Sequence, residues 1–456
     1  MKDLSTGAIP RHIASMSIQM GVGIVVQTLY FFTDLYFVSK LGDQAIAGVT
    51  SAGNMWFIVL ALTQILNVGT VALVSHAVGA QQRDRANLVF NQSLVLSLVM
   101  GAVVLVGVYL VSGHYMHTVA ADETTARAGI QYLYWFGPGL ALQFPMVAMF
   151  ATLRATGMMK PTMILQVITV AVNIFLAPVL IVGWITGHAF GPAGAGLASS
   201  ISVAVGIVLC AYYFGTHEKY VTVHREQLRA QLAVWGRLLL IGLPVGLEFM
   251  LMSLVMGIIY WLIRDFGSSA QAGFGVAQGV MRIIMLPAMA VAFAAAPIAG
   301  QNFGARKPER VRETFKWTVT FSILIMVLLT VLCQFASPFF MHIFTQEEAV
   351  VLVGVQMLMI TSWNFAANGV IFSCSSMFQA LGNTWPTILS SAVRVSIFVV
   401  PAVWLSTRPG FQLVDVWYVS LASMFVQALV SYSLVRREFG RKLVAPGMQA
   451  AVSPSA

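Results

Sequence analysis

Long runs of apolar residues follow one another along almost the whole chain, with short polar segments between them. Most runs reach or exceed the roughly 20 residues that a helix needs to cross a bilayer. Only 9% of the 456 residues are charged, whereas soluble domains carry about a quarter. We therefore predict an all-α integral membrane protein with twelve transmembrane helices, at about 12–39, 47–79, 86–111, 126–152, 162–184, 194–214, 238–263, 269–299, 314–341, 347–379, 387–406 and 413–435.

Prolines inside these spans are expected to mark places where a helix bends or breaks, because proline removes one helical hydrogen bond. They are Pro138, Pro145, Pro178, Pro244, Pro287 and Pro401.

The basic residues are distributed unevenly across the predicted membrane. Of the 25 Lys and Arg residues, 19 fall on the side of the N-terminus, 4 on the other side, and Arg282 and Arg394 within spans. Short cytoplasmic loops carry such an excess of Lys and Arg. We therefore expect a multi-pass protein of the cytoplasmic (inner) membrane with both termini in the cytoplasm. The same bias accounts for the net charge of +9, so no nucleic-acid partner is expected.

An internal repeat becomes visible when the chain is shifted by 225 residues. In one ungapped register, Gly42 falls on Gly267 and Gly157 falls on Gly382, and Ala, Pro and Thr residues near helix ends match as well. Because six is an even number, two six-helix halves enter the membrane in the same sense, related by a pseudo-twofold axis along its normal. The domains expected are an amino-terminal lobe (1–214), a cytoplasmic amphipathic linker (215–237), a carboxy-terminal lobe (238–437) and a cytoplasmic tail (438–456).

A polar stripe on the first helix is the main candidate for function. Asp34, Tyr30, Gln27, Gly23 and Gln19 are spaced by three or four residues, which places them on one helix face. An ionised side chain is costly in hydrocarbon, so such a group faces a bundle interior and marks an ion or substrate path. The alternative is a buried Asp34 that only forms a hydrogen bond with a neighbouring helix.

Other ionisable groups deep in the spans are Glu248, Arg282 and Arg394. The seventh and eighth helices run antiparallel across a short turn, which brings Glu248 and Arg282 to a similar depth. The two could therefore neutralise each other as a pair, or both could line the cleft. Asp34 has no intramembrane base in its own half, which suits a group that loads a proton on one side and releases it on the other.

Weaker candidates surround these acids. Tyr132, Asn173 and Ser199 could exchange hydrogen bonds with Asp34, or each could form an ordinary interhelical bond. Met256 and Met285 could line a substrate cleft, or could be apolar filler. The sequence has no phosphate-binding loop and no metal-ligand spacing, so we expect neither an enzyme nor a bound metal or cofactor.

Several segments resemble one known family. They are TLYFFTDLYFVSKLGDQAIAGV (28–49), AVGAQQRDRAN (77–87) with its echo NFGARKPERVR (302–312), and the turns ATGMMKPT (155–162) and ALGNTWPT (380–387). Together they resemble the multidrug and toxic compound extrusion (MATE) transporters over about residues 10–437. This resemblance implies two six-helix lobes in a V around a central cleft. It also implies export of organic, often cationic compounds against inward flow of protons or sodium ions.

The chain is most similar to the DinF-like branch of that family. This likeness implies that Asp34 carries the coupling ion, with supporting positions at Tyr30, Tyr132, Asn173 and Ser199.

The chain also departs from the family pattern. Gln19 stands where members with a bending first helix have proline, and Ala177 replaces a supporting acid. The segment 361–376 lacks the acid that sodium-coupled members use, and Glu248 lies about one turn before their acid on the seventh helix. Sodium requires several hard oxygen ligands, so protons are favoured as the coupling ion.

We therefore expect a proton-coupled antiporter that exports organic, often cationic amphipathic compounds and acts as a monomer in the lipid bilayer. Its expected cleft residues are Gln27, Glu248, Arg282, Met256 and Met285. The alternatives are sodium coupling, a flippase or exporter for a lipid-linked or anionic metabolite that Arg282 and Arg394 would bind, and a membrane scaffold that moves nothing.

Overall fold

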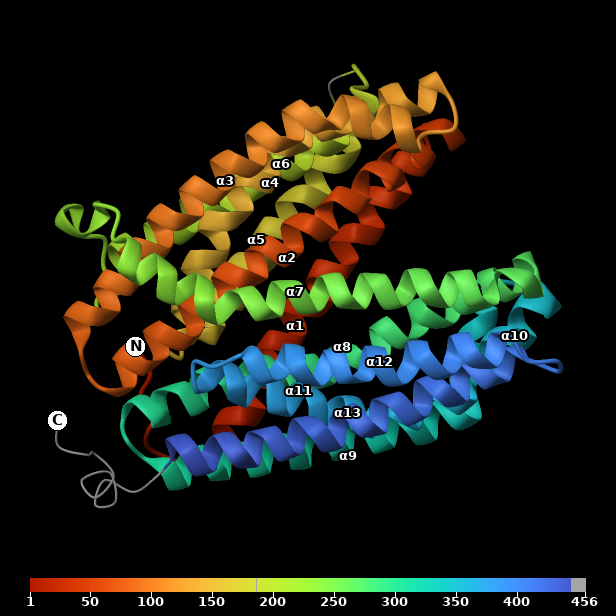
Figure 1. The fold of residues 1–456 in the computed structure, drawn as a ribbon. Helices are drawn as coiled ribbons and strands as arrows, with labels where there is room; N and C mark the ends of the chain where they lie inside the picture. The colour runs from red at the N-terminus through yellow and green to blue at the C-terminus, as the bar shows by residue number, and fades with distance from the viewer. Residues whose placement is uncertain (186, 444–456) are drawn as a thin grey trace. The chain divides into compact units, whose positions relative to one another are not determined.

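A computed structural model of the chain describes residues 1–185 and 187–443, and the backbone alone of residues 30–32. Throughout that range the regular structure is helical, without a strand (Figure 1). The helices of the first half are α1 (Ile9–Ser39), α2 (Asp43–Gly79), α3 (Arg83–Val119), α4 (Glu123–Ala155), α5 (Met159–Ala177), the π-helical turn η1 (Pro178–Val182), α6 (Gly191–Thr216) and the 3₁₀ turn η2 (Arg225–Leu228). Those of the second half are α7 (Leu232–Ile263), η3 (Arg264–Phe266), α8 (Ser268–Gly304), α9 (Pro308–His342), α10 (Glu348–Thr361), α11 (Asn364–Ala380), α12 (Trp385–Ser406) and α13 (Leu413–Lys442).

The membrane-spanning helices agree in number with the prediction. Within the described chain, 11 helices are long and apolar enough to cross a membrane, and the pair α10 and α11 makes a twelfth span when taken together. The all-α fold with twelve spans is therefore confirmed. Residues 444–456 of the expected tail lie outside the described residues.

Two compact units make up the chain. The first consists of residues 1–3 and 19–243, and the second of residues 4–18 together with Pro244 onward. The expected lobe boundaries placed residues 4–18 in the first half, but the structure assigns them to the second unit. The reason is that this segment forms hydrogen bonds with α8 of the second unit. The N–H of Leu4 donates to Gln301 Oε1 at 2.9 Å, and the carbonyl of Leu4 accepts from Asn302 Nδ2 at 3.1 Å. The chain thus changes unit within α1, and again within α7 at Pro244.

The predicted repeat is visible in the backbone of the turns. Gly42 and Gly267, which precede α2 and α8, have φ values of 100° and 90°. Glycine populates this left-handed region without steric cost. Gln81 and Arg306 follow the same two helices, also 225 positions apart, and share φ values of 57° and 56° although neither is glycine. The two turns of each pair have nearly the same φ value and lie 225 residues apart, which confirms the internal repeat.

Helix α4 packs against α2, α3 and α6 in the first unit and continues through Pro138 without a break (Figure 1). A hydroxyl group of α6 forms hydrogen bonds with the backbone of α4 beside this proline. Ser200 Oγ donates to the carbonyl of Trp135 at 2.6 Å and accepts the N–H of Gly139 at 2.9 Å. The helix is therefore not broken at Pro138, and a bend there stays a prediction.

The corresponding span of the second unit does break. Between α10 and α11 the chain bends by 57°, although the break at Ser362 and Trp363 contains no proline. Side chains of α9 bind the freed backbone: Gln334 Nε2 donates to the carbonyl of Met359 at 2.7 Å, and Thr330 Oγ1 donates to that of Ser362 at 2.9 Å. Gln334 Nε2 also donates to Ser362 Oγ at 2.7 Å. These bonds allow irregular backbone within a span.

The substitution Gln334→Leu is expected to lower the thermal unfolding midpoint of the purified protein in detergent. It removes the donor for a carbonyl and a hydroxyl near the break, and an unsatisfied buried polar group costs about 1–3 kcal/mol. The control is Thr320→Val on the same helix, since Thr320 Oγ1 donates to the Lys316 carbonyl of its own helix. Equal midpoints for the two variants would contradict the role of Gln334.

The segment between α6 and α7 is not the amphipathic helix that a linker could form. Residues 217–231 have no regular structure apart from the single 3₁₀ turn η2. Asn91 and Gln92 of α3 are fully buried and bind the backbone of this segment. Asn91 donates to the carbonyl of Thr222 at 3.1 Å, and Gln92 donates to the carbonyl of Arg229 at 2.7 Å. The linker is therefore docked on the first unit.

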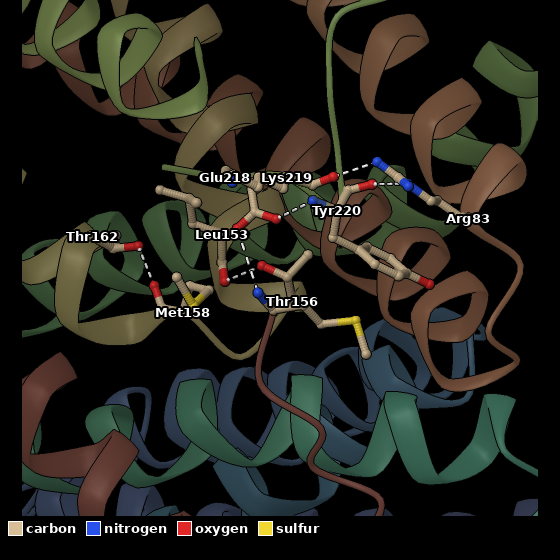
Figure 2. A network of polar contacts seen from close by, with 9 residues as sticks. Arg83, Leu153, Thr156, Met158, Thr162, Glu218, Lys219 and Tyr220 are labelled. Atoms are coloured by element: carbon tan, nitrogen blue, oxygen red, sulfur yellow. Dashed lines mark hydrogen bonds and ion pairs between the residues drawn. The ribbon is translucent and has the colours of Figure 1, made fainter. Parts of the chain in front are cut away.

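Figure 2 shows the beginning of this docked segment. Arg83 of α3 donates to the carbonyls of Lys219 and Tyr220, the latter at 3.0 Å. The N–H of Tyr220 donates to the carboxylate of Glu218 at 2.9 Å. A cation and a buried acid thus fix the chain at the point where it leaves α6.

Candidate ion-coupling site

Asp34 lies on α1, in the part of that helix that belongs to the first unit. Its carboxylate is partly buried and accepts a hydrogen bond from Ser199 Oγ of α6, with 3.2 Å between Oδ2 and Oγ. Ser199 itself is 0% exposed. The acid therefore faces a neighbouring helix of its own unit.

Asn173 of α5 extends this contact into a chain of three polar groups. Its side chain is buried, and its Nδ2 donates to Ser199 Oγ at the long distance of 3.5 Å. The Ser199 hydroxyl thus accepts from an amide and donates to a carboxylate. Such a hydroxyl links the charge of Asp34 to the packing of α5 and α6.

Tyr132 of α4 lies near the same acid. Its side chain is 8% exposed, and the charge of Asp34 acts on its hydroxyl. Tyr132 also packs closely against α6, the helix of Ser199, because a Cβ at Gly196 would lie 2.5 Å from the Tyr132 carbonyl oxygen. The side chain of Tyr30, the other aromatic candidate, lies outside the described residues.

The part of the polar stripe on α1 that lies N-terminal to Asp34 faces α5. Gln166 Nε2 donates to Gln27 Oε1 at 3.3 Å, and a Cβ at Gly23 would lie 2.7 Å from Gln166 Oε1. Gln166 was not predicted from the sequence. It could have been found, because Gln166, Thr169 and Asn173 are spaced by three and four residues and share one face of α5.

A second partly buried acid, Glu248, lies on α7 in the second unit. Its Oε1 accepts a hydrogen bond from Ser391 Oγ of α12 at 2.8 Å, and Gln427 of α13 donates to the same hydroxyl at 3.1 Å. Arg394, one turn along α12 from Ser391, is near enough for its charge to attract that of Glu248. This cluster resembles the first site in placing a serine between an acid and an amide.

The pair of Glu248 and Arg282 does not form. Arg282 is exposed, and within the described part of the chain no carboxylate lies in ion-pair distance of its guanidinium. Similar depth on neighbouring helices did not determine the partner, because Glu248 accepts a hydrogen bond from Ser391 of α12 instead. The predicted methionines, Met256 and Met285, are partly buried and pack against the apolar core of the second unit.

The match to a known protein family is divided in the same way as the internal repeat. The pattern that defines the MatE family matches residues 20–179 and 244–405, in two blocks that begin 224 positions apart. The chain belongs to the MATE family of transporters. It is therefore a multi-pass membrane transporter rather than an enzyme. The match contains Asp34, Tyr132, Asn173 and Glu248, while Ser199 lies between its two blocks.

Relatives of this MATE transporter match it over most of its length. YoeA of Bacillus subtilis, named a probable multidrug resistance protein, is 24% identical over 89% of this chain and 88% of its own. The multidrug export protein MepA of Staphylococcus haemolyticus is 22% identical over 92% of this chain and 93% of its own.

Among solved structures, a MOP superfamily transporter from Pyrococcus furiosus is similar to this MATE transporter with a TM-score of 0.90. The two are 22% identical over 97% of this chain and 98% of that one. That transporter is described as having a binding pocket of reverse polarity, which suggests a different function. At this identity the likeness shows a shared fold, and the assignment of the chain to the DinF-like branch stays a prediction.

Proposed function

We propose that this MATE transporter is a secondary active antiporter that exports organic, often cationic amphipathic compounds in exchange for protons. The observation that carries the proposal is the carboxylate of Asp34, which lies on a membrane-spanning helix and accepts a hydrogen bond from the buried Ser199. Intramembrane acids are costly and mark ion pathways. The names of YoeA and MepA support multidrug compounds as the substrate class.

The polar chain suggests how proton binding changes the protein. Ionised Asp34 accepts the hydrogen bond of Ser199, whose oxygen in turn accepts from Asn173. Protonation adds a donor to the carboxyl group and weakens its attraction for the Ser199 hydroxyl. The packing of α1 against α5 and α6 would then differ between the two protonation states, which is the differential interaction that coupling requires.

Protons are proposed rather than sodium because a sodium ion requires several hard oxygen ligands, and segment 361–376 lacks the acid that sodium-coupled members of the family use. The excess of Lys and Arg on one side supports an orientation in the cytoplasmic membrane with both termini inside. The polar cluster at Glu248 is proposed as part of the substrate path, as are Gln27, Arg282, Met256 and Met285.

A second candidate, export of an anionic or lipid-linked compound, is favoured by Arg282. Its guanidinium is exposed and lacks an ion-pair partner among residues 1–185 and 187–443. An intramembrane cation of this kind can bind a phosphate or carboxylate. Arg394, in contrast, already has the charge of Glu248 beside it.

One experiment separates these possibilities. Purified protein in liposomes is given a fluorescent cationic dye or an anionic dye, with a pH gradient or a sodium gradient imposed separately. Movement of the cationic dye under the pH gradient alone is the expected result. Movement of the anionic dye alone would favour the second candidate. Movement of the cationic dye under the sodium gradient would identify sodium, in place of protons, as the coupling ion. Absence of any dye flux would reject antiport.

A further inference from the structure

A groove in the first unit has no part in the proposed antiport. It encloses about 760 Å³ and is lined by α3, α4, α6 and the start of the docked linker. This volume lies within the roughly 300–1,000 Å³ typical of small-molecule sites. Its two ends differ in chemistry, and this difference indicates what it binds.

The long part of the groove is apolar and lies among membrane-spanning helices. It is lined by Leu94 and Leu98 of α3, Ile207 and Ala211 of α6, and Pro145 of α4. Leu98 is 60% exposed and Ala211 is also exposed, although both belong to helices that cross the membrane. Hydrocarbon chains of the bilayer are the apolar molecules that reach such a surface.

The other end of the groove is polar and carries a cation. Glu218, Lys219 and Thr222 line it. Glu218 is 3% exposed, and its carboxylate accepts the N–H of Tyr220 (Figure 2). The amino group of Met1 also lies 3.7 Å from this carboxylate. Lys219 is exposed, and in the described chain no acid forms an ion pair with it. The charge available to a ligand at this end is therefore positive.

The rest of the linker continues this pattern. Arg225 and Arg229 are exposed, as is the acid Glu226 between them, and within the structure as described neither arginine forms an ion pair. Between Lys219 and Arg229, Val223 is 55% exposed and Leu228 is 37% exposed, and both line the groove. Basic and exposed apolar residues on one segment are typical of a surface that lies at the boundary of a membrane with anionic lipids.

We propose that this groove binds an anionic phospholipid of the surrounding bilayer. One acyl chain lies between α3 and α6 against Pro145, and the phosphate is bound by Lys219, with Arg225 and Arg229 adding attraction for a negative headgroup. The lipid would stabilise the docking of the linker on α3, at a site separate from Asp34. This inference does not depend on the substrate or on the coupling ion of the transporter.

The test is native mass spectrometry of delipidated protein in detergent, titrated with phosphatidylglycerol or with phosphatidylcholine. The wild-type chain is expected to bind phosphatidylglycerol more tightly. The triple variant Lys219→Gln, Arg225→Gln, Arg229→Gln is expected to lose this preference by about fivefold for each cation removed, the factor set by one basic residue near an anionic surface. Ala211→Phe fills the apolar part and is expected to weaken binding of both lipids without changing the charge.

Lys316→Gln is the matched control, because Lys316 is an exposed cation of α9 in the other unit. It should leave lipid binding at the wild-type level. Size-exclusion profiles and circular dichroism report whether each variant is folded. Equal binding of the two lipids by the wild-type chain, or unchanged binding by the folded triple variant and by Ala211→Phe, would overturn the proposal.

Discussion

Asp34→Asn is expected to abolish dye export driven by a pH gradient, down to the rate of protein-free liposomes, while the variant folds normally. Asparagine has nearly the same shape and its carbonyl oxygen can still accept the hydrogen bond from Ser199 Oγ. It cannot bind and release a proton, so the gradient has no group through which to act. The measurement is fluorescence of a cationic dye in proteoliposomes after a pH jump.

Two further variants sharpen this result. Asp43→Asn neutralises an exposed acid at the start of α2, nine positions away, and should export at the wild-type rate. Ser199→Ala keeps the proton-binding acid but removes its hydroxyl donor, so a partial loss of a few-fold is expected. Export by Asp34→Asn at the wild-type rate would show that Asp34 is only an interhelical hydrogen-bonding residue.

The fold was largely predictable because its main determinants are local or periodic. Apolar length gives the spans, and the 225-residue register is confirmed by turns such as Gly42 with Gly267. The break at Ser362 and Trp363 was not predictable from proline content. Whether a span breaks depends on side chains of neighbouring helices, such as Gln334 at this break.

The candidate site was predictable to a lesser degree. The helical spacing on α1 identifies the face that carries Asp34, and the structure brings Ser199 and Asn173 together beside it. The partner of Glu248 was missed, because sequence gives depth along a helix but not the direction in which a neighbouring side chain points. Ser391 contacts it from α12, a helix far away in sequence.

Gly242→Ala is expected to destabilise the folded protein by about 1–3 kcal/mol, the usual cost of overpacking. A Cβ at Gly242 would lie 1.9 Å from the carbonyl oxygen of Ile65, and one at Gly69 would lie 2.3 Å from that of Leu238. The four positions belong to α2 and α7 within the first unit, where the two backbones cross in contact. Small residues allow such crossings between membrane helices.

The matched control is Gly236→Ala on the same helix, where a Cβ would meet nothing within 4 Å. Alanine favours a helix over glycine by about 1 kcal/mol, so this control should be neutral or slightly more stable. The two variants therefore differ only in what surrounds the added methyl group, and their thermal unfolding midpoints in detergent compare the crossing with open space. Midpoints that rise equally in both would mean that α2 and α7 are not in backbone contact at Gly242. A lower midpoint for Gly242→Ala alone would show that this contact, rather than helix propensity, requires glycine there.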